Sequence, residues 1–207
     1  MTITRDGALE WMRLFAAEMG EHRQELVRLD TAIGDADHGT NMDRGMRKAL
    51  EKLDGAEQAD AGAVLKTVAM ALISSVGGAA GPLYGSFFMA AGDALSRSKR
   101  LPEDLAEVFG SGVNAVSARG RSQPGEKTML DVLFPVLEVL KAEAGRPDLI
   151  ERVRAAASEA TARTVPMQAT KGRASFLGAR SIGHVDPGAR SSCVLLHAVC
   201  NTLEARP

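Results

Sequence analysis

The sequence predicts an all-α fold, and three observations carry that prediction. The 207 residues are rich in alanine and leucine, which favour helices, whereas only 4% are aromatic. Apolar residues recur at intervals of three and four, as in Leu9, Met12, Phe15 and Met19, which places them on one face of a helix. No convincing alternation of apolar and polar residues marks a strand.

The periodic segments predict eight helices in order along the chain. Asp6, Asp60 and Asp148 lie near three helix starts, where a side-chain oxygen can cap free backbone N–H groups, and Pro187 suits a first helical turn. Because no repeat or linker divides the chain, residues 1–207 are expected to form a single domain. The helices are expected near residues 5–29, 41–53, 60–76, 82–97, 102–119, 127–144, 148–164 and 187–204.

The charge balance excludes some classes of partner. Lys+Arg 25 against Asp+Glu 26 gives a net charge of −1, which argues against a nucleic-acid-binding protein and against attachment to anionic membranes. The first residues contain no apolar run of the signal-peptide type, and no stretch of uncharged apolar residues is long enough to span a membrane. We therefore expect a cytoplasmic protein.

The two cysteines, Cys193 and Cys200, fall in the last predicted helix. Their seven-residue separation places them about 10 Å apart along a helix axis, too far for a disulfide. We expect two reduced thiols in the core.

The glycines gather between the predicted helices, where they allow sharp turns and a close approach of backbone to a ligand. A helix C-cap explains any single glycine equally well, but clusters that also carry polar residues favour ligand-binding loops on one rim. The clusters are Gly34 and Gly39; Gly77, Gly78, Gly81 and Gly85; Gly120 and Gly125; and Gly172, Gly178, Gly183 and Gly188.

Three carboxylates fall within eight residues of the first such loop, at Asp30, Asp35 and Asp37. Like charges this close repel unless a cation lies between them, and hard carboxylate oxygens without a nearby cysteine favour Mg²⁺ or Ca²⁺ over zinc. An EF-hand is excluded because Thr40 and Met46 occupy the positions of its glycine and glutamate. The alternative is that the aspartates only end a helix and form a turn. Together they predict a magnesium site.

Magnesium usually bridges protein carboxylates to substrate phosphates, so phosphate-binding loops are expected as well. Residues 74–82 (SSVGGAAGP) lead into a helix N-terminus, which stabilises an anion, although a tight turn has the same pattern. Residues 120–128 (GRSQPGEKT) fail the P-loop pattern and leave Lys127 and Thr128 near a helix start.

Imidazole and basic side chains complete the predicted rim. His38 fits better as a hydrogen-bond donor to a ligand than as a metal ligand, because its nitrogen is softer than the surrounding oxygens. Lys171, Arg173 and Arg180 offer further cations for phosphate, although such surface side chains are most often simply solvated. The residues alone thus predict an α-helical protein that binds Mg²⁺ and a phosphorylated ligand.

Five sequence blocks, taken together, resemble the nucleotide-binding L subunit of dihydroxyacetone kinase. Each block is modest alone, but their order makes the match specific, and it extends over nearly the whole chain. The blocks are residues 29–42 (LDTAIGDADHGTNM), 74–84 (SSVGGAAGPLY), 124–131 (PGEKTMLD), 171–175 (KGRAS), and Gly178 with 180–188 (RSIGHVDPG).

The resemblance implies a closed all-α barrel of about eight antiparallel helices with a nucleotide, ADP or ATP, at one end. It implies that Asp30, Asp35 and Asp37 hold two Mg²⁺ ions that bridge the nucleotide phosphates. With the loop analysis it assigns nucleotide contacts to His38, Gly39, Thr40, Asn41, Gly78, Ala79, Ala80, Gly120, Thr128, Met129, Arg173, Asp186, Pro187 and Gly188.

The family also implies a relay. Bound ADP accepts a phosphoryl group from a phosphohistidine on an M subunit and passes it to dihydroxyacetone held on a separate K subunit, so no residue here acts as a nucleophile. One alternative is the L component of an ATP-dependent kinase for dihydroxyacetone or a related ketose. Another is a regulatory nucleotide-binding module that reports to a transcriptional regulator.

Two positions depart from the pattern expected of the family. Ala80 stands where relatives often have serine, which removes one hydroxyl contact to phosphate. Arg190 replaces a smaller polar residue, so we expect an added cation near the rim that alters phosphate affinity or partner docking.

Overall fold

The computed structural model describes residues 3–98 and 105–205, and the regular structure within these ranges is helical throughout. The prediction of an all-α fold is therefore confirmed. In chain order the elements are α1 (Arg5–Glu21), α2 (Arg23–Ile33), α3 (His38–Asp54), α4 (Ala61–Ser75), α5 (Ala80–Arg97), α6 (Leu105–Gly120), α7 (Leu130–Ala142), α8 (Leu149–Arg163), the 3₁₀ helix η1 (Arg173–Ser181) and α9 (Pro187–Glu204).

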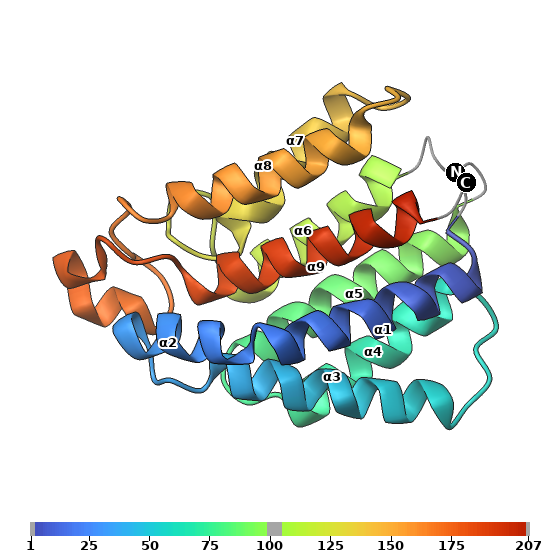
Figure 1. Ribbon diagram of the computed structural model, residues 1–207, viewed down its shortest axis with the longest axis horizontal. Coiled ribbons are helices and arrows are strands. Elements are labelled where there is room, and N and C mark those ends of the chain that lie inside the picture. The colour runs from blue at the N-terminus through green and yellow to red at the C-terminus, as the bar shows by residue number, and fades with distance from the viewer. Residues whose placement is uncertain (1–2, 99–104, 206–207) are drawn as a thin grey trace.

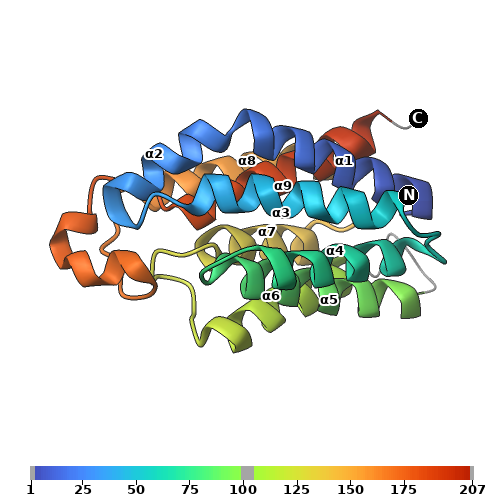
Figure 2. The ribbon, with the colours of Figure 1, turned by 90° about the horizontal axis from the view of Figure 1, so that it is seen from below.

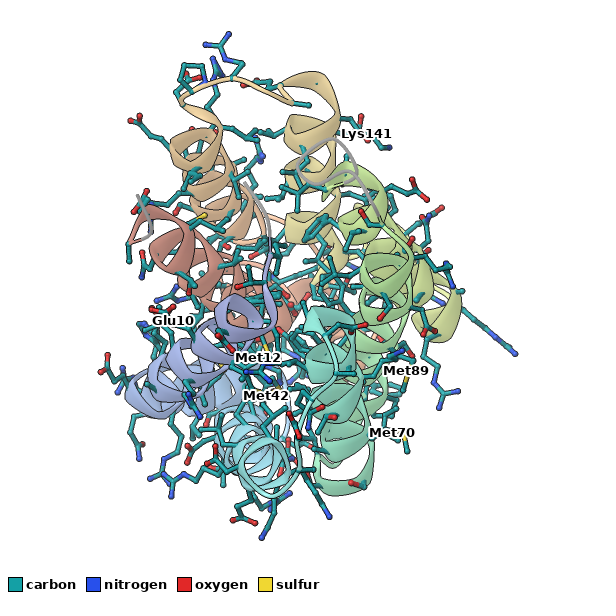
Figure 3. The ribbon with its side chains drawn as sticks, turned by 90° about the vertical axis from the view of Figure 1, so that its right-hand side faces the viewer. Glu10, Met12, Met42, Met70, Met89 and Lys141 are labelled. Carbon is teal, nitrogen blue, oxygen red and sulfur yellow. The ribbon has the colours of Figure 1, made fainter. Side chains whose placement is uncertain are left out.

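The α-helices lie side by side around a common core, as the end-on view in Figure 3 shows. From α3 to α9 each α-helix packs against the next one, α9 returns to α1, and α1 packs against α3. The start of α1 and the end of α9 lie at one end of the molecule, and η1 lies at the other (Figures 1 and 2). The ends of the elements near η1 therefore meet at one place.

The core fills the centre of this ring. Met12 and Met42 point into it and are fully buried, whereas Met70 lies on the outside of α4 with 58% of its surface exposed (Figure 3). Phe87 and Phe88 pack edge to face with their ring centroids 5.5 Å apart. The few aromatic residues are thus used mainly for interior packing, where each buries a large apolar area.

Helices α4 and α5 approach closely because glycines lie at their contact. A Cβ atom on Gly62 would collide with the carbonyl oxygen of Gly92, and one on Gly92 would collide with that of Gly62. Only glycine leaves this space free at both positions.

The single helix predicted over residues 5–29 is wrong in one respect, because it is broken at His22 and its second part continues to Ile33. Gly20 weakens the helix just before the break, and the His22 N–H still reaches the Glu18 carbonyl at 2.8 Å. The His22 imidazole contacts Glu25 at 2.7 Å, so a local side-chain pair stabilises the irregular turn.

Three further differences lie at the end of the molecule that carries η1. Helix α3 begins at His38 rather than near residue 41, and α7 begins at Leu130 rather than near 127. The later start of α7 follows from Lys127, whose positive φ of 61° does not fit a helix. The helix η1 was not predicted at all. The other predicted helix ends lie close to the observed ones, and the start expected at residue 102 falls outside the described ranges.

Both cysteines lie on α9 as expected, and their thiols are free and buried. Within the described part of the chain, no helix combines the length and apolar character needed to cross a bilayer.

Candidate functional site

A cavity of about 490 Å³ opens at the end of the molecule that carries η1. This volume suits a small organic ligand. The N-termini of α3, α5, α7 and α9 contribute to its lining, together with the C-terminal ends of α2 and α6. Free backbone N–H groups and the positive ends of the helix dipoles converge there, which is the arrangement that stabilises a bound anion.

Most of the predicted site residues line this cavity. Gly39 and Thr40 do not, because Gly39 packs against the backbone of α2 at Arg23 and Thr40 is exposed outside the lining. The predicted residues that the structure brings together are Asp30, Asp35, Asp37, His38, Asn41, Gly78, Ala79, Ala80, Gly120, Thr128, Met129, Arg173, Asp186, Pro187 and Gly188.

The three aspartates of the first loop form a compact group. One carboxylate oxygen of each of Asp30, Asp35 and Asp37 lies within 4.8 Å of the others. Asp30 is buried at the end of α2, and its Oδ2 accepts the backbone N–H groups of Asp37 at 2.8 Å and of His38 at 3.0 Å. The loop is thereby folded back over Asp30, which leaves Asp35 and Asp37 exposed at the cavity.

The electrostatics of this group fit a divalent cation. Partial burial, followed by the negative charges of Asp35 and Asp30, raises the pKa of Asp37. The Arg173 Nε lies 2.7 Å from the Asp35 carboxylate and offsets part of this charge. The clustered hard oxygens match the ligands that Mg²⁺ prefers, so Asp30, Asp35 and Asp37 are the residues able to hold it.

His38 begins a chain of polar side chains that runs from α3 into the buried contact between α5 and α9. Its Nε2 lies 2.8 Å from Ser191 Oγ, which lies 2.7 Å from the Tyr84 hydroxyl, and Ser192 continues the chain at 3.1 Å. Burial lowers the pKa of His38 to about 4, so the imidazole is neutral at pH 7. Because Nε2 is engaged with Ser191, a ligand contact of the predicted kind has to use Nδ1.

The loop before α5 presents backbone rather than side chains. Gly78 has a positive φ of 66°, and Ala79 and Ala80 then begin the helix. Arg44 supports the loop from α3, because its Nη2 contacts Asn41 Oδ1 at 2.7 Å and the Ser75 carbonyl at 3.3 Å. The first N–H groups of α5 therefore line the cavity on a fixed backbone.

Lys127, left near a helix start by the sequence, lines the cavity, but its ammonium group is engaged by the protein itself. Lys127 is only 1% exposed, and its Nζ donates to the carbonyls of Met167 at 3.0 Å and Ser181 at 2.6 Å. Burial lowers the pKa of Lys127, and the negative charge of Asp186 partly opposes that change. The ammonium group is thus used to hold the two sides of the segment between α8 and α9.

Asp186 caps the N-terminus of α9 from a buried position. Its Oδ2 accepts the Ala189 N–H at 2.7 Å, and Pro187 occupies the first helical turn as predicted. Burial raises the pKa of Asp186 to about 7, the backbone bond to Ala189 lowers it, and the Asp131 carboxylate raises it further. This wall of the cavity therefore carries an acid that changes its charge near neutral pH.

The expectation of a cation on the rim at Arg190 is wrong. Its Nε lies 2.6 Å and its Nη2 3.0 Å from the two oxygens of Glu25, and Nη2 lies 3.3 Å from the His22 ring. The guanidinium therefore joins α9 to α2 and has a structural contact rather than a free charge.

Comparison with known families adds independent evidence. Residues 32–201 match the DAK2 domain. The chain belongs to the DAK2 domain family. The predicted resemblance is therefore confirmed, and the matched range includes Asp35 and Asp37 of the aspartate group.

Several curated proteins are similar to this chain. The chain is 44% identical over 202 residues to the ADP-binding subunit DhaL of the PEP-dependent dihydroxyacetone kinase 1 of Listeria innocua, which covers 98% of each chain. It is 43% identical to the corresponding subunit of Escherichia coli, over 92% of this chain and 93% of that one. The human triokinase/FMN cyclase is 33% identical, and the match spans only 32% of that protein.

A solved structure shares the fold. The dihydroxyacetone kinase of C. freundii in complex with AMP-PNP and Mg²⁺ superposes with a TM-score of 0.73 over 94% of this chain and 33% of that one, at 24% identity. This similarity concerns the fold of the DAK2 domain.

Sequence reasoning missed several parts of the DAK2 site. Ser191 was not singled out, and Tyr84 appeared only as the end of a sequence block. Arg119 also lines the cavity from the last turn of α6. A tyrosine in a helix and a serine about one turn from a helix start carry no local signal, because their meeting depends on how α5 and α9 pack.

Proposed function

We propose that this chain is the ADP-binding subunit of a phosphoenolpyruvate-dependent dihydroxyacetone kinase. In this proposal Mg²⁺-bound ADP accepts a phosphoryl group from a phosphohistidine of an M subunit and passes it to dihydroxyacetone on a K subunit. The 44% identity over 98% of both chains supports the subunit assignment. The observation that carries the proposal is the aspartate group beside the convergent helix N-termini in a cavity of about 490 Å³.

The finer architecture is part of the same proposal. We infer that residues 1–207 form one domain, a closed barrel of about eight antiparallel helices in which the broken α1 and α2 count as one. The ring of helix contacts supports this inference, and the cavity puts the nucleotide at one end. A cytoplasmic location is also proposed, because the nucleotide and phosphoenolpyruvate are intracellular.

The residues divide the work by their chemistry. Asp30, Asp35 and Asp37 would hold two Mg²⁺ ions, which when bound would neutralise the negative charge of the phosphate oxygens. The N–H groups at Ala79 and Ala80 bind phosphate oxygens without the serine hydroxyl of relatives, and Met129 and Gly120 enclose the nucleotide. The chain binds and aligns the nucleotide, and no side chain has to act as a nucleophile.

Arg173 has a second task in this proposal. Its guanidinium already lies at the mouth, 2.7 Å from Asp35, and can turn to the phosphates once other charges neutralise that carboxylate. Arginine suits this task because its planar donors match phosphate oxygens. The neutral His38 keeps a hydrogen-bonding role and stores no proton for the transfer at pH 7.

Native mass spectrometry of the freshly purified chain tests the proposal. We expect an added mass of ADP with two magnesium ions that survives buffer exchange. Reconstitution with purified K and M subunits and phosphoenolpyruvate should then phosphorylate dihydroxyacetone. A chain that takes up no adenine nucleotide in the presence of Mg²⁺ would contradict the proposal.

A second candidate is the ATP-dependent form of the same reaction. It is favoured by the likeness to the L-erythrulose 1-kinase of Mycolicibacterium smegmatis, 33% identical over 91% of this chain and 34% of that protein. In that case the purified chain would carry no nucleotide, and turnover with the K subunit would need ATP alone. Comparing the two phosphoryl donors in one assay separates these candidates.

A further inference from the structure

The segment between α8 and α9, here called the rim loop (residues 165–185), projects at the cavity end of the molecule (Figure 1). Its neck is closed by backbone, because the Gly183 N–H reaches the Val165 carbonyl at 2.8 Å. The residues that flank the loop are joined as well, because the Asp186 N–H donates to Thr164 Oγ1 at 3.1 Å. The rim loop therefore begins and ends at the same place and has a fixed base.

The rim loop is also held along its length. Lys127 bonds both of its sides at Met167 and Ser181, and Ser181 Oγ accepts the Ala169 N–H at 2.9 Å. Ala169 and Ala174 pack with Ile33 of α2 in a small apolar cluster. A loop fixed by these contacts presents its outer side chains in one arrangement, which lowers the entropy lost when a partner binds.

Phe176 lies on the outside of this rigid loop with 88% of its surface exposed. Its neighbours Ala174 and Leu177 face the small apolar cluster, so the turn of η1 directs Phe176 away from the protein. Phe176 is also outside the cavity lining, whereas Arg173 and Ala174 belong to it. The ring therefore serves neither the core nor a ligand inside the cavity.

The exposed side chains of the rim loop have the composition of a protein interface. Arg173 and Arg180 are exposed on the same loop, and the exposed Ile182 follows them. Protein interfaces are enriched in aromatic residues and arginine, and a rigid exposed aromatic ring is a typical anchor. Arg173 is paired with Asp35, whereas the exposed Arg180 guanidinium favours an acidic surface on the partner.

We propose that Phe176 is the anchor by which this chain docks onto the K subunit, inserting its ring into an apolar pocket bordered by acidic side chains. This inference rests on the proposed function. The acceptor hydroxyl is held by the K subunit and has to reach a phosphate beside Arg173, so that subunit has to cover the mouth of the cavity. Phe176 stands three residues from Arg173 on the same loop, and its exposed ring is available to a protein that covers the mouth.

The test compares two exposed apolar residues. The affinity of the wild-type chain, F176A, F176Y and M70A for the purified K subunit is measured by isothermal titration calorimetry with ADP and Mg²⁺ present. We expect F176A to bind the K subunit at least tenfold more weakly and F176Y to stay close to wild type. M70A, which removes a 58% exposed side chain from α4, should also stay close to wild type.

Two further measurements show whether the loss of affinity in F176A comes from docking onto the K subunit. ADP affinity should be the same in all four proteins, because Phe176 lies outside the cavity lining. In the reconstituted assay F176A should raise the KM for the K subunit and leave kcat unchanged at saturation. Binding of the wild-type chain should weaken with added salt because of the charges around the ring.

The inference is overturned if F176A matches wild type in its affinity for the K subunit, or if M70A loses as much affinity as F176A. Weakened self-association or weakened phosphoryl transfer from the M subunit, with K-subunit binding intact, would assign Phe176 to another occupant. A wild-type chain that retains ADP and Mg²⁺ but binds no K subunit overturns the proposed function together with this inference.

Discussion

The two ends of the helical ring bury different kinds of side chain. At the cavity end, Asp30, Lys127 and Asp186 are buried ionisable groups that are held by backbone hydrogen bonds. At the far end, apolar side chains such as Leu65 and Leu140 surround a small cavity of about 90 Å³. Burying charge costs free energy and burying apolar surface releases it, so the far end stabilises the fold and the cavity end uses part of that stability.

The largest expected effect is on the free energy of unfolding and comes from a substitution at the far end. Leu65 is 2% exposed beside the small apolar cavity, and L65A removes its packing and enlarges the void. We expect a loss of about 2–5 kcal/mol in the free energy of unfolding, measured by urea titration. At a temperature where the variant stays folded, its ADP affinity should match that of wild type. A selective loss of ADP affinity would contradict the division between the two ends.

The next effect belongs to the aspartates. D37N removes one charge from a group whose members repel, so the apo protein should be as stable as wild type or slightly more stable. Mg²⁺-dependent ADP affinity should fall about 100-fold, which corresponds to about 2.7 kcal/mol. Calorimetry with and without Mg²⁺ measures this change, and D54N on the exposed end of α3 is the matched control. Unchanged ADP affinity in D37N would refute the metal assignment.

The third prediction concerns pH. Asp186 has a pKa of about 7 in the folded protein, above the ordinary 3.8. Between these values the folded state holds a proton that the unfolded state has lost, so stability falls as pH rises and levels off above pH 7. D186N keeps a side-chain cap but removes this titration. Its stability relative to wild type should improve by on the order of 2 kcal/mol from pH 5 to pH 8.

Thermal unfolding across this pH range checks the prediction. H184N, an exposed change in the rim loop, serves as the control for a general effect of pH on that segment. A D186N curve parallel to that of wild type would show that Asp186 ionises at an ordinary pH.

The smallest expected effect loosens the rim loop. K127M keeps the length of the side chain but leaves the carbonyls of Met167 and Ser181 without their donor, at a cost of about 1–2 kcal/mol. We expect faster proteolysis within residues 165–185 and weaker binding of the K subunit. K141M, an exposed change on α7, should do neither. Equal proteolysis of K127M and wild type would show that the ammonium group does not hold the loop.

Local patterns predicted much of this molecule. The apolar period of three to four residues predicts most helices, because one face of each helix packs on the same core. Asp30, Asp35 and Asp37 are close in sequence, so their grouping follows from spacing, although Asp30 lies in the last turn of α2 and only Asp35 and Asp37 lie in the loop. The glycine-rich residues 74–82 likewise predict a loop before a helix start, which is where the structure has one.

The parts that could not be predicted depend on contacts between distant segments. Arg190 pairs with Glu25, which lies 165 positions earlier in the sequence, and no local pattern indicates that pair. Lys127 looks like a surface cation until the segment between α8 and α9 covers it. The helix η1 is shaped by hydrogen bonds of Ser175 and Ser181 to nearby carbonyls and by the packing of Ala174, so it shows no helical period.

The position of α9 has a consequence for how the protein is made. This helix closes the ring against α1, carries Asp186, Pro187 and Gly188 into the cavity wall, and supplies Ser191 beneath His38. A nascent chain that still lacks α9 has an open ring and an incomplete cavity, even though all three aspartates have already left the ribosome. The cavity is therefore completed late in synthesis, in the same step that completes the core.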